Sequence, residues 1–65
     1  MQPARTRAAV AAGHAVELVR DRRTGRYYAE LVDLETGAVT RTTPRRRRLA
    51  RMLADAAQAL VGNRP

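Results

Sequence analysis

The pattern D-x-x-T-G occurs twice in this chain, at residues 21–25 and again at residues 33–37. A glycine after a polar turn supplies the left-handed backbone conformation in which many tight hairpin turns end. Three strand-like runs lie before, between and after the two patterns, at residues 15–20, 27–32 and 39–43. Because runs and turns alternate at this short spacing, the sequence predicts a three-stranded antiparallel meander.

The register of the predicted sheet follows from the length of its turns. If each loop has three residues and ends at its glycine, Val16 lies opposite Val32, and Val32 lies opposite Thr40. One face of the sheet then carries Val16, Leu18, Tyr28, Glu30 and Val32, and the other carries Val19, Tyr27, Ala29, Leu31 and Val39. Both faces are half apolar, although antiparallel sheets usually have one wet face. A helix can cover one face, and we expect another cover or a partner, such as a second copy of the chain, on the other.

A helix is predicted after the third run, over residues 44–61. Thr43 is an acceptable N-cap, Pro44 suits the first helical position, and Gly62 is placed to end the helix. Apolar residues recur at spacings of three and four and form one stripe: Leu49, Met52, Leu53, Ala56, Ala57 and Leu60. The predicted fold class is therefore α+β, with the element order β-β-β-α.

The domain organisation follows from these elements. Residues 14–62 are expected to form the single domain. Residues 1–13 are expected to be a flexible basic tail, because their alanines and arginines show no periodicity of large apolar side chains. Residues 63–65 are expected to be a short second tail.

The amino-acid composition excludes most kinds of catalytic residue. Among its 65 residues the chain has no Cys, Ser or Lys, so it offers no thiol, serine hydroxyl or lysine amine as a nucleophile. Its single histidine, His14, cannot complete a zinc site without cysteines. Asp21 and Asp33 start the two turns, where aspartate commonly accepts hydrogen bonds from its own backbone. We therefore expect no enzymatic activity, no metal and no cofactor.

The charge is strongly positive, with 13 arginines against 6 acidic residues and a formal net charge of +7. A polyanionic partner is one interpretation, and arginine-rich codon usage in a GC-rich genome is the other. Arg45, Arg46, Arg47 and Arg48 would occupy the first turn of the predicted helix, with Arg51 one turn later. Because the helix dipole disfavours cations there, the cluster indicates an anion-binding or acidic-partner surface. The alternative is a solvated face whose arginine stems cover apolar surface.

No stretch of the chain approaches the ~20 apolar residues that span a bilayer, so we expect no membrane insertion. The apolar run near the start is interrupted by Gly13 and His14 and makes a poor signal-peptide core. We therefore expect no cleaved signal peptide.

Residues 27–44 resemble the core of the flagellar FlaG family. Members read approximately Y-x-V-x-V-V-D-x-x-T-[GN]-E-V-I-R-[QE]-I-P, followed by an amphipathic helix. The residues that match in register are Val32, Asp33, Thr36, Gly37, Val39, Arg41 and Pro44. The chain departs from the family at Ala38, where an acidic residue is usual, and at Thr40 and Thr43, where isoleucines are usual.

The resemblance implies a small non-catalytic accessory protein of bacterial flagella, linked to filament assembly or length. Its partners would be flagellar proteins such as flagellin or the filament cap, and it would be cytoplasmic or flagellum-associated. Arg41 and Tyr28 are then candidate surface contacts.

Two other hypotheses come from the residues themselves. A nucleic-acid-binding module would use Arg45, Arg46, Arg47, Arg48 and Arg51 without sequence-specific readout, because no recognition-helix motif is visible. Only Tyr27 and Tyr28 could stack on bases, since the chain has no Phe or Trp. A structural miniprotein that depends on a partner would self-associate through the second face of its sheet, as a flagellar accessory protein also could.

Overall fold

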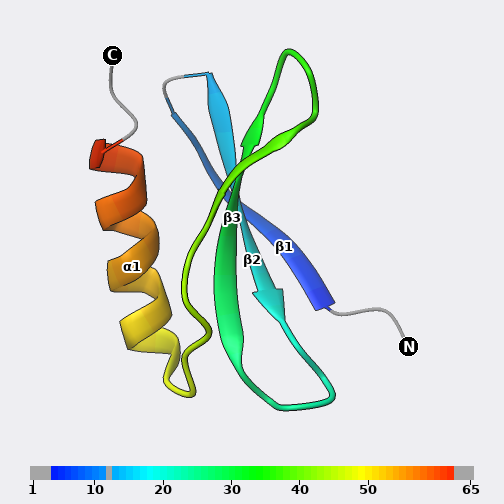
Figure 1. Cartoon of the computed structure of the whole chain (residues 1–65), viewed down its shortest axis with the longest axis vertical. Helices are drawn as coiled ribbons and strands as arrows, with labels where there is room; N and C mark the ends of the chain where they lie inside the picture. The colour runs from blue at the N-terminus through cyan, green and yellow to red at the C-terminus, as the bar shows by residue number, and fades with distance from the viewer. Residues whose placement is uncertain (1–3, 12, 63–65) are drawn as a thin grey trace.

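The computed structural model describes residues 4–11 and 13–62, and within them it contains one antiparallel sheet and one helix (Figure 1). The strands follow in chain order across the sheet: β1 (Ala4–Ala11), β2 (His14–Arg20), β3 (Tyr27–Asp33) and β4 (Val39–Thr42). Helix α1 (Leu49–Gly62) follows the last strand. The predicted α+β class with a C-terminal helix is confirmed, but the prediction of three strands is wrong, because the described residues form four.

The additional strand is β1, which lies in the segment that the sequence predicted as a flexible basic tail. It pairs with β2 from Ala4 opposite Arg20 to Ala11 opposite His14, with a bulge between Arg7 and Ala9. Gly13, with φ of 76°, reverses the chain between the two strands. Alanine and arginine have little strand preference of their own, so pairing with β2 makes this segment a strand. The predicted tail at residues 63–65 lies outside the described residues.

Both D-x-x-T-G patterns form hairpin turns, but each loop has four residues rather than three. The Gly25 N–H donates to the Asp21 carbonyl at 2.7 Å, and the Gly37 N–H donates to the Asp33 carbonyl at 2.8 Å. Both glycines have positive φ, 71° and 76°, which explains why glycine is needed there.

The longer loops shift the register between β2 and β3 by one residue from the predicted one. Val16 pairs with Leu31 instead of Val32, and Val32 pairs with Val39 instead of Thr40. A shift of one residue changes which side chains share a face. The face toward the helix, called the helix face, carries Val16, Leu18, Tyr27, Ala29 and Leu31. The opposite face carries Ala15, Glu17, Val19, Tyr28, Glu30 and Val32.

Helix α1 begins at Leu49 rather than at Pro44, so residues 43–48 form a linker between β4 and α1. Thr43, the predicted N-cap, is buried instead beside β3, where its Oγ1 accepts the Ala29 N–H at 2.8 Å. Arg46 is held to Tyr27 by two backbone hydrogen bonds, at 2.6 and 2.7 Å. These bonds keep the linker extended, and the first turn of α1 closes on the Arg48 carbonyl.

The core lies between α1 and the helix face. Met52 and Ala56 pack against Val16 and Ala29, and Leu18, Tyr27 and Leu60 flank them. The helix packs mainly on β3. Leu49 and Leu53 of the predicted apolar stripe are 47% and 45% exposed, because they lie on the flank of the helix rather than on its buried side.

Candidate nucleic-acid interface

Two arginine-rich segments that are far apart in the sequence meet at one end of the molecule. The bridge between Arg46 and Tyr27 places the linker beside the start of β3, which directly follows the β2–β3 turn. Figure 1 shows this turn, the linker and the first turn of α1 at the same end of the fold. We call this region the basic end, and it carries nine arginines: Arg20, Arg22, Arg23, Arg26, Arg45, Arg46, Arg47, Arg48 and Arg51.

The β2–β3 turn presents its arginines on a defined backbone. The Asp21 carboxylate accepts the Arg23 N–H at 2.9 Å, so this acidic side chain is used within the turn. The Thr24 hydroxyl accepts the Arg26 N–H at 3.3 Å on the other side of the loop. Arg22 and Arg23 are exposed. The turn therefore holds two arginines toward solvent at its tip.

The linker directs successive arginines to different sides, as an extended chain must. The Arg45 guanidinium lies over the Tyr28 ring, 4.7 Å from its centroid. The Arg46 guanidinium turns toward the helix, where Nε and Nη2 donate to the two Asp55 carboxylate oxygens at 2.6 and 3.3 Å. This hydrogen-bonded pair raises the pKa of the Arg46 guanidinium above its usual value. Arg46 thus fastens the linker to α1.

The remaining linker arginines are available to a ligand. Arg47, Arg48 and Arg51 are exposed, and none of them pairs with a carboxylate within residues 4–11 and 13–62. The expectation that residues 45–48 form the first helical turn is wrong, because the helix starts at Leu49 and only Arg51 lies within it. The cluster instead precedes the helix N-terminus, whose dipole adds positive potential at this end.

Of the other two candidates, Arg41 lies apart from this group and Tyr28 contacts it. Arg41 is exposed on β4, and its guanidinium lies near Gly62 at the far end of the helix. Tyr28 lies half-buried on the opposite face of the sheet, under Arg45. The structure thus brings together Arg45, Arg46, Arg47, Arg48 and Arg51, and it leaves Arg41 outside.

Four arginines of the basic end were missed by the sequence reasoning: Arg20, Arg22, Arg23 and Arg26. Their density around the first D-x-x-T-G pattern was the available signal. Nothing in the sequence could show that the linker would pair with the start of β3 and bring the two segments to one end.

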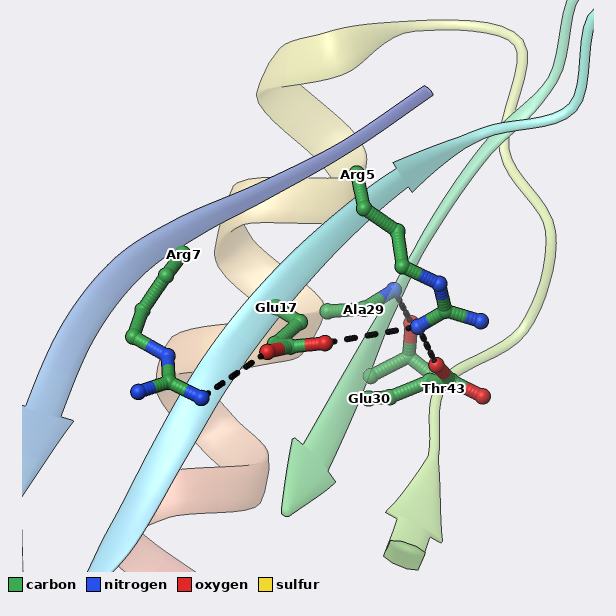
Figure 2. Close-up of polar contacts among 6 residues, drawn as sticks. All are labelled: Arg5, Arg7, Glu17, Ala29, Glu30 and Thr43. Atoms are coloured by element: carbon green, nitrogen blue, oxygen red, sulfur yellow. Dashed lines mark hydrogen bonds and ion pairs between the residues drawn. The ribbon is translucent and has the colours of Figure 1, made fainter. Parts of the chain in front are cut away.

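The face of the sheet opposite the helix carries an ion-pair network. Figure 2 shows Arg5 and Arg7 extending from β1 toward Glu17 and Glu30. Arg7 contacts Glu17 at 3.2 Å, and Arg5 contacts both Glu17, at 3.4 Å, and Glu30. The hydrogen bond to Glu30 raises the pKa of the Arg5 guanidinium. Two arginines and two glutamates balance in charge here, so this network does not extend the basic end.

Two apolar residues of that face are buried among their neighbours. Val19 lies between Arg5 and Tyr28 in the register and is 1% exposed. Ala15, which lies between Val10 and Val32, is fully buried. The sheet face on which we expected a second copy of the chain thus buries part of its apolar surface within the molecule, although Val10 on the same face is 60% exposed. Self-association through it stays a prediction.

The described residues contain no group of three or more potential metal ligands from His, Cys, Asp and Glu. In the same part of the chain no helix has the length and apolarity to cross a membrane. Comparisons with protein-family models, with curated proteins and with solved structures find no match to the chain.

Proposed function

We propose that this chain is a non-catalytic nucleic-acid-binding module that holds the phosphate backbone with its basic end and does not read sequence. The observation that carries this proposal is the meeting of two arginine segments, at residues 20–26 and 45–51, at one end of a small fold. Arginine suits this role because its planar guanidinium donates two parallel hydrogen bonds to a phosphate.

The distribution of acidic residues supports the same role. Glu17 and Glu30, in the middle of the sheet, both form ion pairs with Arg5. Asp33 ends β3 and Glu35 lies in the turn that follows, at the end of β3 opposite to the basic end. At the basic end itself, Asp21 is bonded within its turn and Asp55 is paired with Arg46. The molecule therefore carries its positive potential at one end, which would orient it toward a polyanion.

The test is a fluorescence anisotropy titration of labelled DNA of about 20 base pairs, at salt concentrations from about 50 to about 200 mM. We expect measurable affinity at low salt and a steep decrease with salt, because each neutralised phosphate adds about 0.9 to the logarithmic slope. The variant Arg47→Gln/Arg48→Gln should bind more weakly and lower the slope by about 2.

The matched control is Arg7→Gln/Arg41→Gln, which removes the same net charge from positions outside the basic end. It should retain nearly the wild-type slope. Equal losses in the two double variants would mean that net charge alone drives binding and would contradict a localised site. Absence of binding at about 50 mM salt to this duplex, to its single strand and to an RNA duplex of the same sequence would overturn the proposal.

A flagellar accessory role, as the FlaG resemblance implies, is the second candidate. What supports it is that residues 27–44, which carry the resemblance, fold as the β3–β4 hairpin with its linker, directly before an amphipathic helix. The matching Asp33, Thr36 and Gly37 are also explained by the turn itself. The Asp33 carboxylate accepts the Thr36 N–H at 3.1 Å, and Gly37 has φ of 76°.

This second role is tested by co-sedimentation with flagellin filaments and by binding to purified filament cap protein. Binding that is lost in Arg41→Ala, with DNA binding unchanged, would support it. A host without flagellar genes would rule it out.

A further inference from the structure

We infer that the nucleic acid held by the basic end is double-stranded DNA, with the tip of the β2–β3 hairpin entering its major groove. The inference rests on the proposed function and specifies its partner. It depends on two observations: the contacts that the aromatic rings already make within the protein, and the shape of the basic end.

Both tyrosine rings are already engaged within the protein. Proteins that bind single strands stack successive bases on exposed aromatic side chains. Tyr27 is half-buried against the core, with the Arg20 guanidinium 5.8 Å from its ring centroid. Tyr28 is half-buried under Arg45, at 4.7 Å. A base that stacked on the face of either ring beside its guanidinium would have to displace that guanidinium.

The remaining aromatic ring is distant from the basic end. His14 begins β2, whereas Arg20 ends it, so the two lie at opposite ends of that strand. Because the chain has no Phe or Trp, the basic end offers arginines without a free stacking surface. This combination suits the regular phosphates of a duplex better than the unstacked bases of a single strand.

The shape of the basic end also fits a double helix. The β2–β3 turn projects as a hairpin at this end of the sheet (Figure 1). The major groove of B-form DNA, about 12 Å wide, admits a two-stranded β-ribbon. Arg22 and Arg23 lie in the exposed part of this loop, between β2 and β3.

The linker completes the contact. Because Arg46 is bonded to Tyr27 at the base of the hairpin, Arg47 and Arg48 lie beside the hairpin rather than at its tip. With the tip in the groove, these two arginines would face the phosphates along the edge of the groove. The bonded pair of Arg46 and Asp55 holds the linker in that position.

The experiment compares a labelled DNA duplex, one of its single strands, and an RNA duplex of the same sequence, all at one salt concentration. We expect the DNA duplex to bind at least about tenfold more tightly than either of the others. The RNA duplex is included because its major groove is deep and narrow and does not admit side chains. Arg22→Gln/Arg23→Gln should remove this preference, whereas Arg7→Gln/Arg41→Gln should retain it.

Circular dichroism spectra of both double variants establish that they are folded, which is expected because Arg22 and Arg23 are exposed. If the single strand or the RNA duplex binds as tightly as the DNA duplex, the inference is wrong, although the proposed function stands. If none of the three polynucleotides binds, the proposed function itself is overturned.

Discussion

At the residue scale, the Thr43 side chain accepts a hydrogen bond from a different backbone N–H than the one that the sequence suggests. A threonine before a proline and a helical pattern is a reasonable N-cap. In the structure the linker is paired with β3, and the Thr43 hydroxyl accepts the Ala29 N–H while its own N–H donates to the Ala29 carbonyl at 2.9 Å. A helix N-cap and a hydrogen bond to β3 both place the threonine oxygen near a backbone N–H, so the sequence could not distinguish these two roles.

Replacing Thr43 with valine should destabilise the fold. Thr43→Val keeps the shape of the side chain but leaves the buried Ala29 N–H without its partner, at a cost of about 1–3 kcal/mol. Urea denaturation measures this change in the free energy of unfolding. Thr43→Ser, which restores the hydroxyl, should recover much of the loss. Thr42→Val, at the exposed neighbouring position, should change stability by less than about 0.5 kcal/mol. Equal effects at the two positions would contradict the assigned hydrogen bond.

A second residue, Asp33, should make stability depend on pH. The backbone N–H groups of Thr36 and Glu35 donate to its carboxylate and hold its pKa below the usual value. A carboxylate with a lower pKa in the folded state contributes stability that is present above its unfolded pKa, about 3.9, and is lost as the pH falls through the folded value. Asp33→Asn should lack this contribution.

The measurement is the urea midpoint of wild type and Asp33→Asn between about pH 6 and about pH 2.5. The wild-type advantage should be constant near neutral pH and should shrink below about pH 4. A difference that stays the same across the whole range would show that the carboxylate charge does not stabilise the turn.

At the element scale, the sequence predicted most of what local chemistry determines. The two hairpins could be predicted because a left-handed glycine after Asp-x-x-Thr has few alternatives. Their loop length could not be predicted, since loops of three and four residues both end in such a glycine, and the one-residue difference reverses the faces of β2 relative to β3. The helix start was misplaced because tertiary hydrogen bonds to Tyr27 keep Arg46 extended.

Strand β1 was missed because its structure comes from pairing and not from its own residues. Deleting residues 1–12 should therefore destabilise the domain substantially, by at least about 2 kcal/mol. The deletion leaves β2 as an edge strand, uncovers Val19 and removes both arginine partners of Glu17. Thermal unfolding followed by circular dichroism should show a much lower midpoint or no cooperative transition. An unchanged midpoint would mean that the segment acts as the tail that the sequence suggested.

At the scale of the whole molecule, the candidate site exists only because the fold brings two segments together. The sequence identified residues 45–48 as an unusual arginine cluster, but for residues 21–25 it indicated only a turn. The segments that carry Arg22 and Arg47 lie at the same end of the molecule because a bridge of two hydrogen bonds joins the linker to β3. The availability of the tyrosine rings likewise depends on which guanidinium lies over each of them. Both facts are tertiary, and neither is encoded in a local pattern.

The same charge concentration should oppose the stability of the free protein. With a net charge of +7 and nine arginines at one end, we expect repulsion to outweigh the attraction of the ion pairs among the described residues. Arg47→Gln/Arg48→Gln should therefore be more stable than wild type at low salt, by up to about 0.5 kcal/mol. Near 1 M salt, where the screening length falls to about 3 Å, the difference should disappear. Urea denaturation is the suitable measurement, because urea adds no ions.

The comparison with Arg7→Gln makes this prediction specific to the basic end. Arg7 contacts Glu17 at 3.2 Å, so its loss removes an attraction as well as a charge and should not stabilise the protein. If Arg47→Gln/Arg48→Gln were less stable than wild type at low salt, these arginines would be structural, and the basic end would need no ligand to explain it. If that variant is more stable and binds DNA more weakly, the arginines reduce the stability of the free fold, and binding a polyanion offsets their repulsion.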